Sequence, residues 1–240
     1  MPVAGYVTYV TGIDPIAYSR RRLPPNPRQS FHPFHASELE RFPRLFQDAD
    51  SIPGLTWPTL SFQHSLVVMM GELEVQLKQL GRGHTKGDTI VWVPEERVMF
   101  AGDLVESEAG VYTGDAYLQD WPQTLKNIAA LGPRVIVPGR GPALDTAKKI
   151  EEGLDYTRDW VTTLYRCAKE AVNLKMDLRN AMIHTRKTMD PKFGHIYVYE
   201  HCLPFDVARA YDEASGIADP AIWTAQRDQA LWRELQLDIE

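Results

Sequence analysis

The sequence predicts an α/β fold in which a sheet of short strands is followed by a helical C-terminal region. Segments rich in β-branched and apolar residues, separated by turn residues, occupy residues 57–101. From residue 121 onward, apolar side chains recur at helical spacing. The 240 residues are 44% hydrophobic and 24% charged, an ordinary globular composition for one or two domains.

Four strands are expected in the first half of the chain. Residues 57–70 and residues 73–80 are expected to be strands, and the second alternates between apolar and polar side chains. Residues 89–93 and 97–101 are rich in β-branched and apolar residues, and the Pro-Glu-Glu turn at 94–96 between them indicates a hairpin. The alternation in the second strand indicates that one of its faces is solvated.

A helix over residues 121–131 follows the hairpin. Asp120 is a preferred N-cap residue, and Gln123 three positions later completes a capping-box pattern. Gly132 and Pro133 end the helix. Residues 134–137 then form a short buried strand.

The C-terminal region is predicted to be helical throughout. A long helix begins near Thr146, because apolar residues from Ile150 to Val172 fit one face of a helix. Three shorter helices follow. The last is marked by Asp219 and Pro220 as N-cap and first helical residue, and Trp223 and Leu231 belong to its apolar stripe.

The first 35 residues differ in composition from the remainder. They contain six prolines, four arginines and one acid, for a net charge of +3, whereas the other 205 residues carry −9. We therefore divide the chain into an atypical Pro/Arg-rich segment at 1–35, a core at 36–145 and a helical region at 146–240. This segment is not expected to be a mitochondrial transit peptide, because the prolines within residues 1–35 would break the amphipathic helix that such a peptide needs.

Composition excludes several classes of protein. The net charge of −6 argues against a sequence-independent nucleic-acid binder, which needs many Lys and Arg contacts to phosphates. The sequence contains neither an apolar run long enough for a membrane span nor a secretory signal pattern. Two cysteines, Cys167 and Cys202, are too few for a disulfide scaffold and fit a reducing compartment, so we expect a cytoplasmic protein.

Three short motifs follow strands of the expected sheet in order. They are Gly-His-Thr-Lys-Gly-Asp at 83–88, Ala-Gly-Asp at 101–103 and Pro-Gly-Arg-Gly at 138–141. Each motif alone is weak, because a histidine after a strand is often structural and Gly-Asp is a common turn. Their order and spacing carry the information.

With these motifs the sequence resembles the metallo-β-lactamase superfamily of αββα metallohydrolases, over residues 37–147. The resemblance implies that His84 is a zinc ligand. It also implies that Asp103 supplies a carboxylate that bridges or binds the second metal and acts in catalysis by positioning the metals. The expected activity is metal-dependent hydrolysis of an ester, thioester or lactone in a small-molecule substrate.

The third motif departs from the family pattern, which has histidine where this chain has Arg140. A guanidinium offers only hydrogen-bond donors, so Arg140 cannot be a metal ligand. It could instead bind a substrate carboxylate or phosphate through a bidentate contact. The alternative is that Arg140 pairs with a nearby acid such as Asp103.

The family's His-x-His-x-Asp-His signature is absent from this sequence. The nearest pattern contains His32 and His35, whose spacing does not reproduce the signature, and only 31 residues precede it. We therefore expect an αββα sandwich that is incomplete at its N-terminal side, with a helical C-terminal extension. A frameshift or rearrangement that replaced the ancestral N-terminus would account for both features.

Two functional hypotheses follow from the resemblance and its departures. One is a hydrolase with a degenerate zinc site at His84 and Asp103, completed by the N-terminal segment, a partner chain or residues 195–202. The other is a catalytically silent, truncated or frameshifted member with a binding role or none, in which case zinc is not bound. We interpret His195, and the adjacent pair His201 and Cys202, as structural residues.

A sheet that lacks its N-terminal strands presents an unpaired edge and apolar surface. We therefore expect self-association into a homo-oligomer, and no nucleic-acid or membrane partner.

Overall fold

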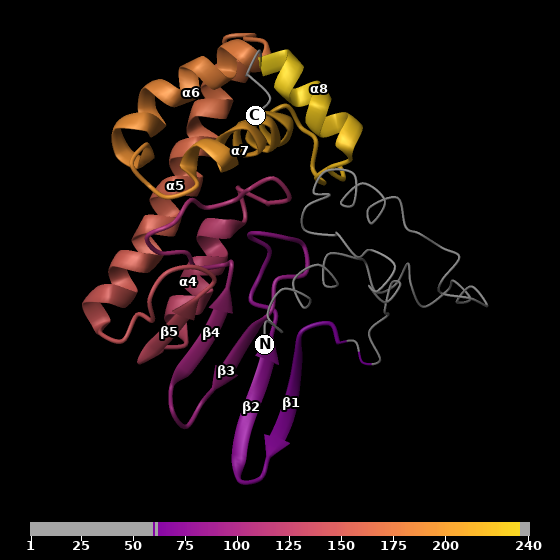
Figure 1. Ribbon diagram of the computed structural model, residues 1–240. Helices are drawn as coiled ribbons and strands as arrows, with labels where there is room; N and C mark the ends of the chain where they lie inside the picture. Colours follow the sequence, from indigo (N-terminus) through magenta and orange to yellow (C-terminus); the bar gives the residue numbers. More distant parts are fainter. Residues whose placement is uncertain (1–59, 61, 236–240) are drawn as a thin grey trace, which may run out of the picture. The chain divides into compact units, whose positions relative to one another are not determined.

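The computed structural model describes residue 60 and residues 62–235, which form a mixed five-stranded sheet and five labelled helices (Figure 1). The described residues fall into two compact units. Residues 62–220 contain the sheet and helices α4–α7, and residues 221–235 contain α8. The segment 1–35, His32 and His35 lie outside the described residues, as does the first part of the strand expected at 57–70.

The sheet contains its five strands in sequence order. They are β1 (Ser65–Met70), β2 (Leu73–Lys78), β3 (Ile90–Val93), β4 (Val98–Gly102) and β5 (Val135–Pro138). The first four are antiparallel neighbours, whereas β5 runs parallel to β4. Because parallel neighbours need a crossover, helix α4 (Trp121–Ala130) lies between β4 and β5 in the chain. The sequence placed these elements with ends that differ by a few residues, except that the strand expected from residue 57 begins only at Ser65.

Three helices complete the first unit, and the longest of them organises the other two. They are α5 (Ala147–Asn173), α6 (Leu178–Phe193) and α7 (Tyr199–Ala214). Helix α5 packs against α4, α6 and α7, and Figure 1 shows it running from beside α4 and β5 up to the α6–α7 pair. None of the helices within residues 62–235 is long and apolar enough to cross a bilayer.

Helix starts show where local sequence rules hold and where they fail. Thr146 caps α5 as expected, because its Oγ1 accepts a 3.2 Å hydrogen bond from the Lys149 N–H. The capping box expected at Asp120 does not form. The Asp120 side chain makes no capping bond and accepts instead from Arg82 Nε at 2.7 Å, so a partner 38 positions away replaces the local one.

Two further expectations about the C-terminal region are corrected. The last helix, α8 (Ala225–Leu235), starts five residues after Pro220, with Thr224 Oγ1 accepting from the Arg227 N–H at 3.2 Å. Asp219 does not cap it, because that carboxylate accepts a 2.8 Å hydrogen bond from the Tyr117 hydroxyl. The apolar run at 196–199 is not a strand: Tyr197 forms one isolated bridge and α7 then begins.

A buried ion pair on α7 holds the loop that leads into α4. Arg209 and Glu213 lie one turn apart, 3.2 Å between Nη2 and Oε2, and both are buried. Glu213 accepts the backbone N–H groups of Leu118 and Gln119 at 2.9 and 3.0 Å. Arg209 Nε donates to the carbonyl of Ala116 at 2.7 Å. The pair therefore satisfies backbone groups that would otherwise be buried without partners.

We predict that Glu213→Ala lowers the free energy of unfolding by about 3–5 kcal/mol, because it leaves the buried Arg209 guanidinium without its counter-charge and the buried Leu118 N–H without its acceptor. Urea unfolding followed by circular dichroism measures the change. Glu152→Ala is the matched control, since it also removes the acidic member of an i,i+4 ion pair, the exposed pair with Lys148. This change should cost at most about 0.5 kcal/mol. Equal losses in the two variants would contradict the prediction.

Candidate functional site

The three sequence motifs meet at one edge of the sheet because of strand direction. Strands β2, β4 and β5 run the same way, since β2 and β4 are both antiparallel to β3 and β5 is parallel to β4. Their C-terminal ends therefore lie at a common edge, as the arrowheads in Figure 1 show. The loops with His84, Asp103 and Arg140 leave from that edge.

The loop of the first motif is fixed by its own turn and by the segment before α4. The N–H and hydroxyl of Thr85 both donate to Asp88 Oδ1, at 2.9 and 2.7 Å. The Tyr117 N–H donates to the carbonyl of Gly83 at 2.8 Å. A side chain at Gly83 would collide with Leu104 and Trp121, so glycine is required where this loop packs.

The His84 imidazole is buried and faces the second motif. Its Nε2 lies 3.8 Å from Asp103 Oδ2. The indole of Trp121 packs edge-on to the ring, and Tyr112 packs against it at a tilt, each with ring centroids 6.1 Å apart. Nδ1 is buried and has no hydrogen-bond partner among the residues that the structure describes. The ring is thus held by packing, with one nitrogen directed toward a carboxylate.

Asp103 is held by the glycines of the third motif. A Cβ on Gly139 would collide with Asp103 Oδ1, and a Cβ on Gly141, at φ +93°, would collide with the Ser107 carbonyl. Backbone hydrogen bonds join the two loops, from Gly139 N–H to the Val105 carbonyl at 3.0 Å and from Ser107 N–H to the Arg140 carbonyl at 3.1 Å. The Pro-Gly-Arg-Gly motif is therefore needed for close loop packing.

Arg140 pairs with Glu106 rather than with Asp103. Its Nη1 donates to Glu106 Oε1 at 2.6 Å, and the Arg140 side chain is 42% exposed while that of Glu106 is buried. Burial raises the pKa of Glu106 to about 8, although the neighbouring guanidinium lowers it. The Glu106 N–H donates to Thr157 Oγ1 of α5 at 3.0 Å. The expected arginine–acid pairing is thus found, with a different acid.

A second buried acid lies on α7. Asp206 is fully buried, and its Oδ1 accepts from the Thr113 N–H at 2.7 Å, while Oδ2 has no hydrogen-bond partner within residues 62–235. Burial raises the pKa of Asp206 to about 8, and the backbone hydrogen bond from Thr113 partly offsets this. Burial also raises the pKa of the Cys202 thiol to about 12, with Asp206 adding to the shift.

Residues 195–202 do not complete a metal site within the described part of the chain. His195 and His201 are exposed, and the buried Cys202 thiol stays protonated at neutral pH. No group of three or more His, Cys, Asp or Glu side chains that could hold a metal occurs within residues 62–235.

The described residues fit part of a metal site. Zinc bonds to nitrogen and oxygen of about 2.0–2.2 Å could span the 3.8 Å between His84 Nε2 and Asp103 Oδ2. A catalytic zinc takes three protein ligands, so one more is needed. A second ion does not fit the third motif, because Arg140 places a cation there and donates no lone pair.

Two contributors to the site were not found by sequence reasoning. Glu106 follows Asp103 by three residues, but nothing in its local sequence indicates that its carboxylate is buried and paired with Arg140. Trp121 opens helix α4, and its indole borders His84 and donates to the Leu104 carbonyl at 3.0 Å. Both contributions depend on contacts between segments far apart in the chain.

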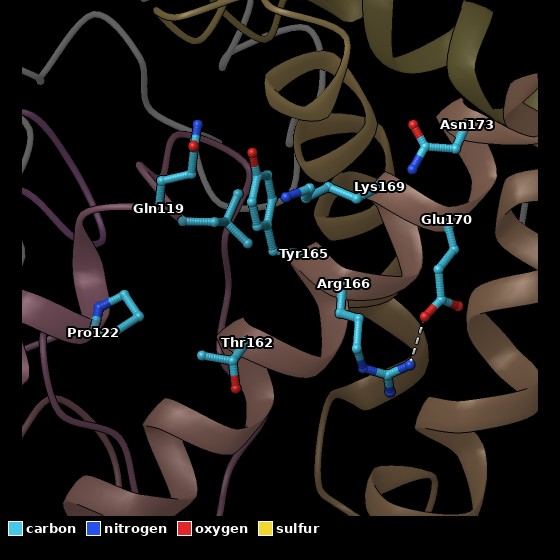
Figure 2. Close-up of a pocket in the computed structure, with 9 residues that line it drawn as sticks. Gln119, Pro122, Thr162, Tyr165, Arg166, Lys169, Glu170 and Asn173 are labelled. Carbon is cyan, nitrogen blue, oxygen red and sulfur yellow. Dashed lines mark hydrogen bonds and ion pairs between the residues drawn. The ribbon is translucent and has the colours of Figure 1, made fainter.

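A cavity of about 520 Å³ lies between the start of α4 and the middle of α5, and no motif residue lines it. Figure 2 shows its polar wall on α5, where Lys169 extends toward the ring of Tyr165 and Arg166 pairs with Glu170. Because its cations are already engaged with these neighbours, we assign it no function.

The fold and the loop geometry define an α/β protein with a partial metal site at the C-terminal edge of its sheet. The model of the metallo-beta-lactamase superfamily matches residues 13–140, more than half of the chain. The chain therefore belongs to that superfamily. Its mixed sheet and helical C-terminal part confirm the expected fold class, an incomplete metallo-β-lactamase fold with a helical extension.

Curated relatives match over limited stretches. A metallo-beta-lactamase type 2 from Bacteroides fragilis is 34% identical over 93 residues, 37% of this chain and 37% of the relative. A beta-lactamase-like protein 2 homolog from Caenorhabditis elegans is 30% identical over 100 residues, 41% of this chain and 33% of the relative. The chain thus spans about a third of the length of these relatives.

Solved structures in the same group are also similar. A metallo-beta-lactamase from Pontibacter korlensis has 21% identity and a TM-score of 0.39, covering 52% of this chain and 62% of that one.

We predict that stability falls as pH rises, with Asp206 as one source. The folded state holds a proton up to about pH 8, whereas the unfolded carboxyl loses it near its ordinary pKa of 3.8. Stability from this group is therefore complete below about pH 4 and lost as pH approaches 8, at about 1.4 kcal/mol per pH unit. Urea unfolding at pH 5, 6, 7 and 8 measures the slope.

Asp206→Asn should flatten that slope, since the amide cannot titrate and can still accept from Thr113. Glu151→Gln, an exposed change on α5, is the control and should leave the slope as it is in wild type. An unchanged slope in Asp206→Asn would rule out Asp206 as a source.

Proposed function

We propose that this protein is a metal-dependent hydrolase of an ester, thioester or lactone, with a single metal ion held between His84 and Asp103. The observation that carries the proposal is the direct approach of the His84 imidazole to the Asp103 carboxylate at the edge where all three motif loops meet. Membership of the superfamily supports a hydrolytic reaction on a small molecule.

A bound zinc ion would supply Lewis-acid polarisation of the scissile carbonyl and activation of a water molecule. The chain's own residues prepare for this chemistry. The His84 imidazole can offer an Nε2 lone pair to a cation, and the Asp103 carboxylate offers an oxygen beside it. Trp121 and Tyr112 limit rotation of the imidazole by packing against its ring, which keeps the ligand preorganised.

The third protein ligand must come from outside the described residues or from a partner chain. His32 and His35 remain the candidates from this sequence, as the match to the family begins at residue 13 and includes both. The site is degenerate in a second respect, because Arg140 occupies the motif position that the family fills with histidine. A mononuclear site follows from these two features.

Arg140 is proposed as the anchor for an anionic group of the substrate. One face of its guanidinium is engaged by Glu106, while 42% of the side chain is exposed at the edge of the sheet. A guanidinium has five N–H donors, so donors remain for a substrate carboxylate or phosphate. Glu106 acts as a positioning residue in this proposal, since it fixes the arginine without reaching solvent.

The alternative is a catalytically silent member that binds a ligand or has no role. It is favoured by the presence of only two suitable donors at the site within residues 62–235. Metal content separates the two proposals directly.

We predict about one zinc per wild-type chain after purification without chelator or affinity metal, falling below about a tenth in His84→Ala and in Asp103→Asn, since each removes a needed ligand. Inductively coupled plasma mass spectrometry measures the content. His195→Ala removes an exposed histidine outside the site and should retain the metal. Metal-free wild-type protein would overturn the hydrolase proposal and leave the silent alternative.

For Arg140, we predict a loss of about 10- to 100-fold in kcat/KM for a carboxylate-bearing ester in Arg140→Met combined with Glu106→Gln, because a charge-assisted contact is removed. The double change avoids leaving a buried carboxylate unpaired. Hydrolysis of the matching neutral ester should change less than about threefold. Glu106→Gln alone is the control for the buried change, and equal losses on both esters would contradict substrate anchoring.

A further inference from the structure

The two edges of the sheet are treated differently by the chain. The outer edge of β5 is partly covered by the segment that follows it, which turns back so that Leu144 and Ile136 exchange backbone hydrogen bonds of 3.0 and 2.8 Å. The opposite edge is β1, which pairs with β2 on one side. No further strand within residues 62–235 pairs with its other side.

The register of the β1–β2 hairpin determines which backbone groups point outward. The Gln79 N–H donates to the His64 carbonyl at 2.9 Å, so the pair 64 and 79 is hydrogen-bonded. Antiparallel ladders alternate, so the next hydrogen-bonded residues on β1 are Leu66, Val68 and Met70. The N–H and C=O groups of Ser65, Val67 and Met69 therefore face away from β2.

The β1 strand has none of the usual features that protect an edge. Its sequence, Ser-Leu-Val-Val-Met-Met, contains no charge and no proline, and its pairing with β2 has no bulge. Its side chains are exposed on both faces of the sheet, with Val67 52% and Met69 60% exposed on one and Met70 64% exposed on the other. Such an edge is a template for pairing with another strand.

We propose that β1 pairs antiparallel with β1 of a second copy of this chain, which joins two five-stranded sheets into one. A second copy fits because the edge is self-complementary under two-fold symmetry. Outward-facing residues must meet outward-facing residues, which places Val67 opposite its own counterpart and Ser65 opposite Met69.

In this register Leu66 lies opposite Val68 on the other face, and no charged side chain lies opposite another. Every outward N–H and C=O of the strand gains a partner, and the exposed valine and methionine side chains gain apolar cross-strand neighbours. A partner with a charged edge strand would not supply these apolar contacts. The proposal is independent of any metal or hydrolytic activity, so it stands or fails separately from the proposed function.

Size-exclusion chromatography with light scattering on the full chain tests the proposal. Wild type is expected at twice the mass of one chain, and Val67→Lys at the mass of one chain, because the substitution brings two ammonium groups together at the symmetry axis. Leu174→Lys adds the same charge at a residue 64% exposed beyond α5 and should remain dimeric. Far-UV circular dichroism confirms that both variants are folded.

A cysteine at position 67 tests the register itself. Hydrogen-bonded antiparallel pairs place Cα atoms about 5.5 Å apart, within the range of about 4.4–6.8 Å that a disulfide bridges. Val67→Cys should therefore form a covalent dimer under mild oxidation, and Leu174→Cys should not. The native Cys167 and Cys202 are both buried and do not compete.

At a chain concentration of about 100 μM, a dimer with a Kd of about 1 μM would be almost fully formed. A wild-type monomer at this concentration would overturn the proposal and would indicate that β1 is covered within one chain. Persistence of the dimer in Val67→Lys would overturn it as well, since the contact would then lie elsewhere. Equal cross-linking of the two cysteine variants would contradict the register.

Discussion

The site depends on how closely the loop after β5 approaches the loop after β4. Gly139 lies against Asp103 where no side chain fits, and Gly141 lies against the carbonyl of Ser107 in the left-handed region of φ. Backbone hydrogen bonds between the loops hold this approach. The position of the Asp103 carboxylate relative to His84 follows from it, as does the direction in which Arg140 leaves the backbone.

Charge is arranged around that approach in two layers. One layer contains the buried His84, the part-exposed Asp103 and the half-exposed Arg140. The other layer contains two buried acids, Glu106 beneath Arg140 and Asp206 on α7, both with pKa values raised by burial. A histidine at the position of Arg140 would need no such counter-charge, so the arginine and the buried glutamate form one unit. This unit fixes a cation at the loop after β5.

The helical region supports the site from behind. Thr157 of α5 bonds the backbone at Glu106, and the Tyr156 hydroxyl donates to the Ala109 carbonyl at 2.7 Å. The Arg209–Glu213 pair of α7 holds the segment before α4, and therefore the tryptophan that borders His84. The region beyond the motifs thus fixes the loops that carry them, while at the other side of the sheet no strand within residues 62–235 pairs with the outer edge of β1.

The sequence by itself determined the local elements and the motifs. Strands β2–β5 and helices α4–α7 follow from periodicity, Thr146 caps α5 as its residue type predicts, and the superfamily follows from three motifs in order. Tertiary structure decided that Arg140 pairs with Glu106 and that Asp120 binds Arg82 instead of capping α4. It also decided that residues 195–202 add no metal ligand to the site within residues 62–235. Capping and periodicity act within a few residues, whereas these partners are brought together only by packing of distant segments, which local sequence does not encode.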